Sequence, residues 1–558
     1  MKKIFRRVLL LVLLFTFIFS AVGCNNGGVE IDSTRTQLRI YAYNGGYGLE
    51  WLNDAIKNFE EKYATTSFEE GKIGVQCHLE PGSTGGGTLI GTGRYDVFFT
   101  EGSSTISDNI SSGEIAPITD IVTEKLTEFG ETRSIEDKFL SENQKSYFNV
   151  DYQGTGSGQY YTLPLYAAVF GIIYDVDLFD DYGFYFKEGG GFVTSKTDVK
   201  ATGPDGVSRT SDDGLPATYD DFFALCDYMR DSGVQPFTLN GAYRDWYMER
   251  IMSNMHADNE GYDQIILNYS FKGMAKTLIS VDESGIVSKI PETEINNRNG
   301  ALVYKQAGRY YATDFLSRLI NGEGYFDQDK TYSQSYSHTE AQSDFLYSNV
   351  VSTETPIGML LEGNYWEEEA EKMGIYKQMS SRYSDVDRND RRFGFMPFPK
   401  ATAEQVYEGN RLTLQDSLFA QAFIPSTIKK EILPAAKKFL QFFYSDANLV
   451  NFTRLTGTMI SMDYNISDEV RRDLSYYTNT IIDAFKSERT DYVYPSAHNI
   501  MYLDNVGRFY ENAWTSTIAN TDKLHPISML REGQSVKSIF DGYYLFREAQ
   551  WEGFSQYF

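Results

Sequence analysis

A short loop near the start of the chain contains residues that suit the binding of a small polar molecule. Residues 39–51 read RIYAYNGGYGLEW, in which Tyr43, Asn44 and Tyr47 surround a pair of glycines just before an amphipathic segment. Backbone N–H groups are free at a turn between a strand and a helix, and they can bind an anion or a polar ligand. An amide side chain both donates and accepts hydrogen bonds, and tyrosine rings add flat apolar surface. The pattern therefore predicts a binding site, either for a phosphate or for another polar solute.

A nucleotide phosphate is the less favoured of these ligands. The loop lacks the G-x-G-x-x-G fingerprint of dinucleotide sites, and Glu80, which closes the next predicted strand, lies beyond the roughly 20-residue separation of that fingerprint. A second glycine cluster, at residues 82–93, lacks the Lys-Ser/Thr ending of a phosphate loop. We therefore expect no nucleotide and no other cofactor.

Two acidic residues follow apolar runs that read as buried strands. Glu101 comes near the end of residues 95–102, and Glu362 near the end of residues 356–363. A carboxylate needs a partner or water when it is buried, so we expect Glu101 at the edge of a solvated cleft. The alternative for Glu101 is a helix N-terminus, where it would stabilise the following turn. In a cleft, either carboxylate could hydrogen-bond a polar solute.

Aromatic residues near these positions complete the candidate set. Sugars present hydroxyls, which need donors and acceptors, together with C–H faces that pack on aromatic rings. Core packing is the alternative for Trp366 in EGNYWEEE, and a structural position at a helix start is the alternative for Trp246 in YRDWYMER. The residues expected to contact a polyhydroxylated solute are Tyr43, Asn44, Tyr47, Glu101, Tyr166, Trp246, Glu362, Tyr365 and Trp366.

Motifs for catalysis and for transition metals are missing from the sequence. The five histidines show no HExxH spacing, and neither a G-x-S-x-G elbow nor a Cys–His pair is found. A glycoside hydrolase that uses Glu101 and Glu362 as its carboxylate pair is a less favoured alternative. Residues 203–214 contain carboxylates that could bind calcium, but they lack EF-hand spacing, so a surface turn is favoured. We expect neither an enzyme nor a metal site.

The N-terminus indicates export and lipid anchoring. Two lysines and two arginines precede an apolar run that is too short to span a membrane, as in a secretory signal. The following Ala21-Val22-Gly23-Cys24 resembles a bacterial lipobox, in which the cysteine thiol is lipid-modified. We expect a signal peptide at 1–23, a lipid on Cys24 at the outer face of the cytoplasmic membrane, and a flexible tether at 24–36. An ordinary signal peptide with a chance cysteine is the alternative.

The amino-acid composition disfavours some classes of binding partner and favours others. Removal of residues 1–23 lowers the 51 basic residues to 47 against 77 acidic ones, a formal net charge of −30 that disfavours nucleic acid and anionic lipid. The 41 tyrosines provide many rings with one apolar face and one wet edge, as in sites for polar organic molecules. Cys77 and Cys226 lie in apolar segments, and we expect them to be buried free thiols.

Strands and helices alternate along the chain, which predicts an α/β fold of two or three lobes. Strands are expected at residues 37–43, 72–80, 95–102, 171–179, 356–363, 393–399 and 417–425. Helices are expected at residues 52–63, 218–233 and 433–446, with Thr218 as an N-cap. The turn-rich stretch 186–216 and the polar stretch 326–345 are expected to be loops.

Seven ordered blocks resemble the extracellular solute-binding proteins, family 1, of bacterial ABC transporters. The blocks are LRIYAYNGGYGLEWLNDAIKNFEEKY, YDVFFTEGSS, YTLPLYAAVFGIIYDVDLF, TYDDFFALCDYM, IGMLLEGNYWEEEAEKM, FGFMPFPK and AAKKFLQFFYSDANLVNFTRLTG. Each is weakly specific alone, but their order and spacing behind a lipobox are distinctive. The resemblance covers nearly all of residues 37–460, and the C-terminal hundred residues fit loosely.

The resemblance implies a two-lobe fold of the type II periplasmic-binding-protein class, with a hinge and an interlobe cleft. Lobe 1 would contain residues 37–160 and 394–455, and lobe 2 residues 161–393 and 456–558. The implied function, like that of maltose-binding proteins, is capture of a carbohydrate, an oligosaccharide, by a monomer that delivers it to ABC permease subunits. The alternative is the same fold with a peptide, a polyamine or an organic acid as its solute.

Overall fold

A computed structural model of the chain describes residues 30–83, 86–101, 103–151, 157–350, 354–382, 391–416, 420–487, 489–493, 513–517 and 525–557. The predicted signal peptide, Cys24 and the first part of the predicted tether lie outside these ranges. Within them, no helix combines the length and the apolar character that crossing a membrane requires. Cys77 and Cys226 are free thiols, as the sequence predicts. Cys226 is buried as expected, whereas Cys77 is only partly buried.

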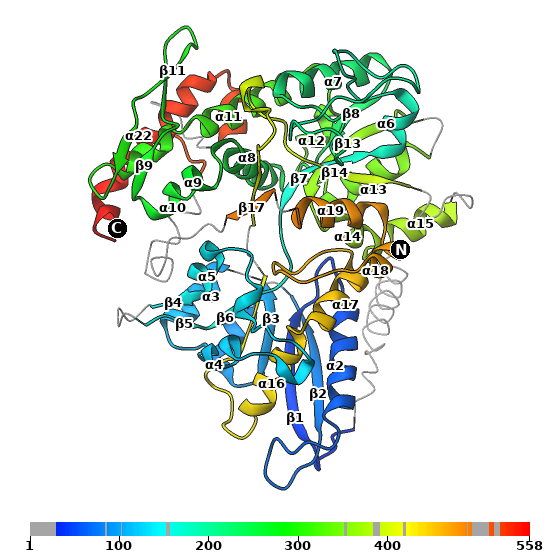
Figure 1. Cartoon of the computed structure of the whole chain (residues 1–558), viewed down its shortest axis with the longest axis vertical. Coiled ribbons are helices and arrows are strands. Elements are labelled where there is room, and N and C mark those ends of the chain that lie inside the picture. The colour runs from blue at the N-terminus through cyan, green and yellow to red at the C-terminus, as the bar shows by residue number, and fades with distance from the viewer. Residues whose placement is uncertain are drawn as a thin grey trace, which may run out of the picture.

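The lower lobe in Figure 1 is built on a sheet with the strand order β2-β1-β3-β16-β6. Strands β1 (Thr36–Tyr43), β2 (Val75–Gly82) and β3 (Val97–Glu101) run parallel, while β16 (Ala420–Phe423) is antiparallel to β3 and β6 (Thr162–Pro164) is antiparallel to β16. Helices α2 (Glu50–Lys62), α16 (Leu433–Phe443) and α17 (Asp446–Thr456) cover this sheet. Helix α2 buries Trp51, Leu52, Ala55 and Phe59, whose spacing puts them on one side of the helix.

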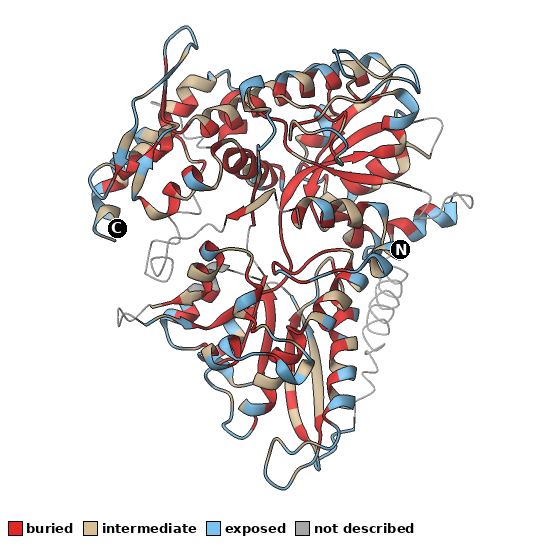
Figure 2. Cartoon of the chain, in the orientation of Figure 1, coloured by how far each residue is buried: buried red, intermediate tan, exposed pale blue. Residues whose placement is uncertain are grey.

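The upper lobe contains a second sheet, with the strand order β14-β7-β13-β8. Strand β7 (Phe170–Asp175) lies antiparallel to both β14 (Phe393–Met396) and β13 (Ile357–Gly363), and β8 (Gln235–Thr238) is parallel to β13. Every residue of β7 and β13 is buried, so both faces of this sheet are covered, as the continuous apolar runs predict (Figure 2). Together with the first sheet, this confirms the predicted α/β class.

Side-chain capping explains where several helices begin. Helix α7 (Tyr219–Asp231) begins at the predicted N-cap Thr218, which also forms a capping box with Asp221. The expected strand 171–179 is wrong in its second half, because the side chain of Asp175 accepts a hydrogen bond from the N–H of Leu178 and starts α6 (Val176–Tyr182).

The expected polar loop at 326–345 is also wrong. It contains α12 (Gln328–Thr331) and most of α13 (His338–Ser348). Helix α13 starts with a second capping box, formed by Ser337 and Glu340. This Ser-x-x-Glu pattern is readable in the sequence, but the polar composition around it hides the helix. The stretch 186–216 has no described helix or ladder strand, in agreement with the expected loop.

Three segments pass side by side between the lobes. The first joins β6 to β7, the second joins β14 to β16, and the third follows α17. The first and third pair directly, since the N–H of Ala167 donates to the carbonyl of Met459 over 2.8 Å. Asn364, directly after β13, contacts both segments: its side-chain oxygen accepts a hydrogen bond from the N–H of Val169, and its side-chain nitrogen donates to the hydroxyl of Thr458.

The strand pairing moves the expected lobe boundaries. Residues 162–164, predicted to start lobe 2, pair with β16 in the lower sheet. Residues 394–396, predicted to return to lobe 1, pair with β7 in the upper sheet. The first crossing therefore lies after β6, which satisfies its backbone groups in the lower sheet. The second crossing lies between β15 (Leu412–Gln415), which pairs with β17 (Thr490–Val493) in the upper lobe, and β16 of the lower sheet.

A mainly helical part of the upper lobe holds the C-terminal region, which fits the family blocks only loosely. Helix α8 (Arg244–Glu260) packs on α11 (Ala307–Asn321), and α22 (Val536–Phe554) packs on α11 and on η4 (Gly300–Lys305). Two short antiparallel strand pairs extend it: β9 (Gly273–Ala275) with β12 (Thr293–Ile295), and between them in the chain β10 (Ile279–Val281) with β11 (Val287–Lys289). Trp551 of α22 is 6% exposed, which shows that the C-terminus contributes to the core.

Candidate functional site

The candidate site lies where the carboxyl ends of strands from both sheets meet. Tyr43 ends β1 and Glu101 ends β3, while Glu362 comes one residue before the end of β13. In open α/β sheets, ligands bind outside the carboxyl ends of the strands. The structure therefore brings together polar residues that are far apart in the sequence.

Aromatic rings connect the two lobes at this junction. Tyr47, from the loop after β1, is 6% exposed, and its ring centroid lies 4.4 Å from that of Tyr166 and 5.9 Å from that of Tyr365. The row continues in the upper lobe, because Phe170 lies 5.9 Å from Tyr365 and 5.1 Å from Trp246. The rings offer the apolar surface on which the C–H face of a sugar can pack.

The loop after β1 also contacts α14 (Trp366–Lys372) of the upper lobe. A Cβ atom added at Gly46 would lie 3.0 Å from the Cβ of Glu369, so the two backbones approach closely only because residue 46 has no side chain. On the surface nearby, Lys372 forms an ion pair with Glu50 of α2 at 3.2 Å. The lobes are thus closed on each other along this side.

Little space is left beneath this contact. A cavity of about 20 Å³ lies between Tyr43, Tyr47, Glu101 and Tyr166. That volume holds about one water molecule. A solute the size of a sugar therefore needs the lobes to move apart at this point before it can enter.

Three carboxyl groups gather at the junction: Glu101 from the lower lobe, and Glu362 and Glu369 from the upper lobe. Burial, reinforced by the charge of Glu369, raises the pKa of Glu101 to about 8, and the same two causes raise the pKa of Glu362 to about 8. Glu362 is fully buried and accepts a hydrogen bond from the N–H of Gly363 over 2.8 Å. At pH 7 both carboxyls are therefore mainly protonated, and a protonated carboxyl can donate as well as accept a hydrogen bond.

The carboxylate of Glu369 interacts with two side chains of α13, Gln342 and His338. Its Oε2 accepts a hydrogen bond from Nε2 of Gln342 over 2.7 Å, and its Oε1 lies 3.4 Å from Nε2 of His338. Burial lowers the pKa of His338, but the hydrogen bond to Glu369 and its charge outweigh burial and raise that pKa overall. Burial, with the charges of Glu101 and Glu369, raises the pKa of Tyr43 to about 12, which keeps its hydroxyl protonated.

Trp366 requires a correction. Its side chain is fully buried in the upper lobe, with ring centroids 5.7 Å from Phe345, 5.1 Å from Phe393 and 5.6 Å from Tyr477. The first residue of α14 points into the core, while Tyr365, one position earlier, points toward the other lobe. Trp366 thus follows the core alternative and is not available to stack on a solute.

The other predicted residues lie at or near the junction. Trp246 is 38% exposed, with its ring edge-on to Phe170. Asn44 is exposed and is held by its backbone, whose N–H donates to the carbonyl of Gly82 over 2.9 Å. Tyr166 is 7% exposed beneath the loop after β1, where it lines the small cavity.

Five residues at the junction escaped prediction: Tyr243, Tyr247, His338, Gln342 and Glu369. Tyr247 interacts with Glu362 and Tyr365, and the ring of the 54% exposed Tyr243 lies 5.8 Å from His338. Helical spacing could have revealed some of them, because Glu369 follows Tyr365 by four positions, and Tyr247 follows Tyr243 by the same interval. His338 gives no such signal, since only the fold brings α13 to the junction.

The possible calcium loop at residues 203–214 uses its carboxylates within the protein. Oδ1 of Asp205 accepts from the N–H of Val207, Oδ2 of Asp213 accepts from the N–H of Arg209, and Oδ2 of Asp205 pairs with Arg489 at 3.1 Å. Across the described ranges, no group of three or more His, Cys, Asp or Glu residues is placed to hold a metal ion. These contacts agree with the turn that the sequence favours.

Residues 50–279, less than half of the chain, match the family model described as bacterial extracellular solute-binding protein. The match confirms the resemblance inferred from the sequence for that stretch. Three solved structures share the fold. A chitin oligosaccharide binding protein is 15% identical, with a TM-score of 0.54 over 93% of this chain and 100% of that one. RafE in complex with raffinose is 11% identical, with a TM-score of 0.51 over 92% and 98%. MalE3 of T. maritima with bound maltose is 13% identical, with a TM-score of 0.52 over 92% and 99%.

At these identities the three structures establish the two-lobe fold of the periplasmic-binding-protein class, as predicted, and nothing finer. No curated protein sequence matches the chain.

Proposed function

We propose that this chain, whose residues 50–279 match the extracellular solute-binding proteins, captures a carbohydrate between its lobes and delivers it to an ABC importer. The observation that carries the proposal is the junction itself, where Tyr43, Tyr47 and Glu101 of one lobe face Tyr365 and Glu362 of the other. Aromatic rings and protonated carboxyls together match the C–H faces and hydroxyls of a sugar. The names of the three similar structures, which refer to raffinose, maltose and a chitin oligosaccharide, point to the same class of solute.

The protonation of the site favours a neutral solute over a polyamine. Glu101 and Glu362, each with a pKa of about 8, are mainly uncharged at pH 7, and Glu369 is paired with His338. A cationic solute would need several ionised carboxylates, and an acidic solute would need an unpaired arginine. A neutral oligosaccharide needs neither.

Closure would link binding to transport. A solute that contacts both lobes stabilises the closed form in proportion to its higher affinity for that form. Permease subunits could then recognise the closed shape of the monomer. The predicted lipid on Cys24, followed by the tether of residues 24–36, would hold the chain near those subunits at the outer face of the cytoplasmic membrane.

Hydrolysis of the bound sugar is the disfavoured alternative. A retaining glycosidase needs one ionised carboxylate as nucleophile beside one protonated acid. At pH 7 both Glu101 and Glu362 are mainly protonated, so this pair lacks the ionised member. This pair therefore suits hydrogen bonding to a sugar better than hydrolysis.

Thermal shift and calorimetry with maltose, raffinose, N,N′-diacetylchitobiose, spermidine and a tripeptide test the proposal. We expect stabilisation by at least one sugar, because a ligand selective for the folded state raises the melting temperature by mass action. Stabilisation by spermidine or the peptide alone would overturn the carbohydrate assignment. Release of reducing sugar from the oligosaccharides would instead show an enzyme.

A further inference from the structure

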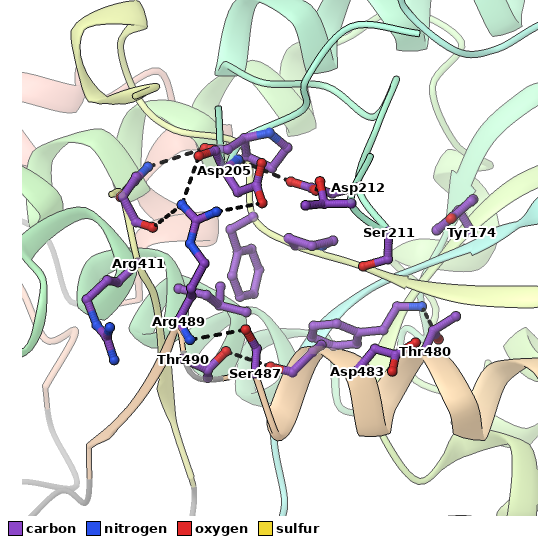
Figure 3. Close-up of a pocket in the computed structure, with 18 of the residues that line it drawn as sticks. Tyr174, Asp205, Ser211, Asp212, Arg411, Thr480, Asp483, Ser487, Arg489 and Thr490 are labelled. Carbon is purple, nitrogen blue, oxygen red and sulfur yellow. Dashed lines mark hydrogen bonds and ion pairs between the residues drawn. The ribbon is translucent and has the colours of Figure 1, made fainter. Parts of the chain in front are cut away.

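A second and much larger cavity lies in the upper lobe, away from the interlobe junction. Its volume is about 460 Å³, within the range of about 300–1,000 Å³ that small-molecule sites occupy. One side of the cavity is formed by α19 (Tyr476–Phe485), with Thr480 and Asp483, and by Ser487 just after this helix (Figure 3). The other side is formed by Asp205, Ser211 and Asp212. None of the residues around this cavity lines the small interlobe cavity.

The floor of this upper-lobe cavity is aromatic. Phe395 of β14 and Phe398 beyond it contribute rings, and the ring of Tyr174 packs over Gly394 of the same strand. Tyr476, at the start of α19, is 46% exposed at the cavity. These rings offer apolar surface to one face of a bound molecule.

The stretch 203–214 forms the opposite wall and is firmly held. Arg489 donates to Oδ2 of Asp205 over 3.1 Å, to the carbonyl of Asp205 over 3.0 Å and to the carbonyl of Asn410 over 2.8 Å (Figure 3). A Cβ atom at Gly206 would lie 2.8 Å from the backbone of Tyr407, so the stretch also packs closely on the next segment. The wall is therefore built before any ligand arrives.

Charged side chains around the cavity neutralise one another. Arg489 pairs with Asp205, Arg411 pairs with Asp491 at 2.6 Å, and Lys400 pairs with Asp258 at 2.6 Å. Asp483 is in turn paired with Arg471 at 2.5 Å. Among the described residues that line the cavity, Asp212 is the exception, because its carboxylate has no ion pair and accepts hydrogen bonds from the N–H of Asp205 and the hydroxyl of Thr210. Each described basic residue that lines the cavity is paired, so an anion finds no free counter-charge among them, and a neutral ligand can donate hydroxyl hydrogen bonds to the cavity.

Three hydroxyl groups remain for that ligand. Within the described ranges, the hydroxyls of Ser211, Tyr174 and Tyr476 make no hydrogen bond, and all three residues line the cavity. A hydroxyl both donates and accepts, which is what the hydroxyls of a sugar require of their partners.

We propose that this upper-lobe cavity is a second binding site, for a neutral polyhydroxylated ring of one or two sugar units. It goes beyond the proposed interlobe function, because all its walls belong to the upper lobe and binding there needs no closure. Such a site would hold one part of a longer glycan, or a separate sugar, on the outside of the transport cleft.

Calorimetry and saturation-transfer NMR at millimolar maltose, raffinose or N,N′-diacetylchitobiose test this inference with three variants. Ser211→Trp fills the mouth, Tyr476→Ala removes the exposed ring, and Tyr182→Ala is the control, because Tyr182 is 41% exposed elsewhere on the same lobe. With one of these sugars we expect two binding events. Each cavity variant should weaken one event about tenfold or more, while the control keeps both.

Trp246→Ala tests the interlobe site. It should weaken only the binding event that the two cavity variants leave unchanged. A single event, unchanged by both Ser211→Trp and Tyr476→Ala, would overturn the second site and leave the interlobe proposal intact. Loss of both events in Trp246→Ala would also overturn it. If only the event sensitive to Ser211→Trp is seen, the second site stands and the interlobe proposal fails. Binding of adenosine but no sugar in the cavity would reject a sugar ligand.

Discussion

The rings of Tyr47 and Tyr365 lie 5.9 Å apart at an interplanar angle of 78°, although they belong to different lobes. Such an edge-to-face pair contributes about 0.5–1.5 kcal/mol beyond the area that it buries. Together with the approach of Gly46 to Glu369 and the ion pair of Lys372 with Glu50, it forms a direct contact between the lobes on this side.

Replacement of Tyr365 tests whether this ring serves the solute. We expect Tyr365→Ala to weaken sugar binding about tenfold, because it removes both a stacking surface and the contact with Tyr47, as measured by calorimetry. Tyr365→Phe is the control and should keep most of the affinity. Equal affinity in Tyr365→Ala would place the ring outside the binding surface.

Gly46 offers a test of closure without removing any contact group. A Cβ at this position would lie 3.0 Å from Glu369, so Gly46→Val should push the lobes apart and lower sugar affinity while the melting temperature of the free protein changes little. Gly553→Val is the control, since a Cβ there meets nothing within 4 Å. The same affinity in Gly46→Val and Gly553→Val would show that the contact plays no part in binding.

Trp366→Ala should act on stability. The fully buried ring packs on Phe345, Phe393 and Tyr477, and loss of such a ring costs about 3–5 kcal/mol in the free energy of unfolding. Urea denaturation measures this loss directly. If Trp366→Ala keeps its stability but no longer binds sugar, Trp366 contacts the sugar and the assignment to the core is wrong.

The raised pKa values predict how stability depends on pH. The pKa of Glu362 rises from 4.5 to about 8 on folding, so above pH 4.5 the unfolded chain releases a proton that the folded chain keeps. The free energy of unfolding should therefore fall from about pH 4.5 to about pH 8 and then level off, and Glu101 adds to the same trend. Denaturation of Glu362→Gln at different pH values measures this effect. Between pH 4.5 and pH 8, its free energy of unfolding should fall by at least about 1 kcal/mol less than that of the wild-type chain. An identical slope in the variant would contradict the raised pKa.

The sequence predicts the parts of the fold that depend on local patterns. Continuous apolar runs mark β3 and β13, and the capping residue Thr218 marks α7. Strand partners follow from long-range contacts, which explains why β6 and β14 were assigned to the wrong lobes. The helix α13 was missed because its polar composition hides its capping box.

The candidate site likewise contains residues that local patterns predict and residues that only long-range contacts bring into place. Tyr43, Asn44 and Glu101 stand at the ends of recognisable strands, and the strand direction alone predicts that they share one edge. His338 and Gln342 reach the junction on α13, which local sequence does not connect to either strand. Tyr365 and Trp366 are neighbours of similar chemistry, and only the start of α14 decides which of them enters the core.

Closure around a solute is most directly measured by small-angle X-ray scattering of the protein without residues 1–23, with and without a sugar that calorimetry shows to bind. We expect the radius of gyration to fall on addition of that sugar in the wild-type chain, and to fall less in Gly46→Val. A radius that stays constant at saturating sugar in the wild-type chain would contradict capture between two closing lobes.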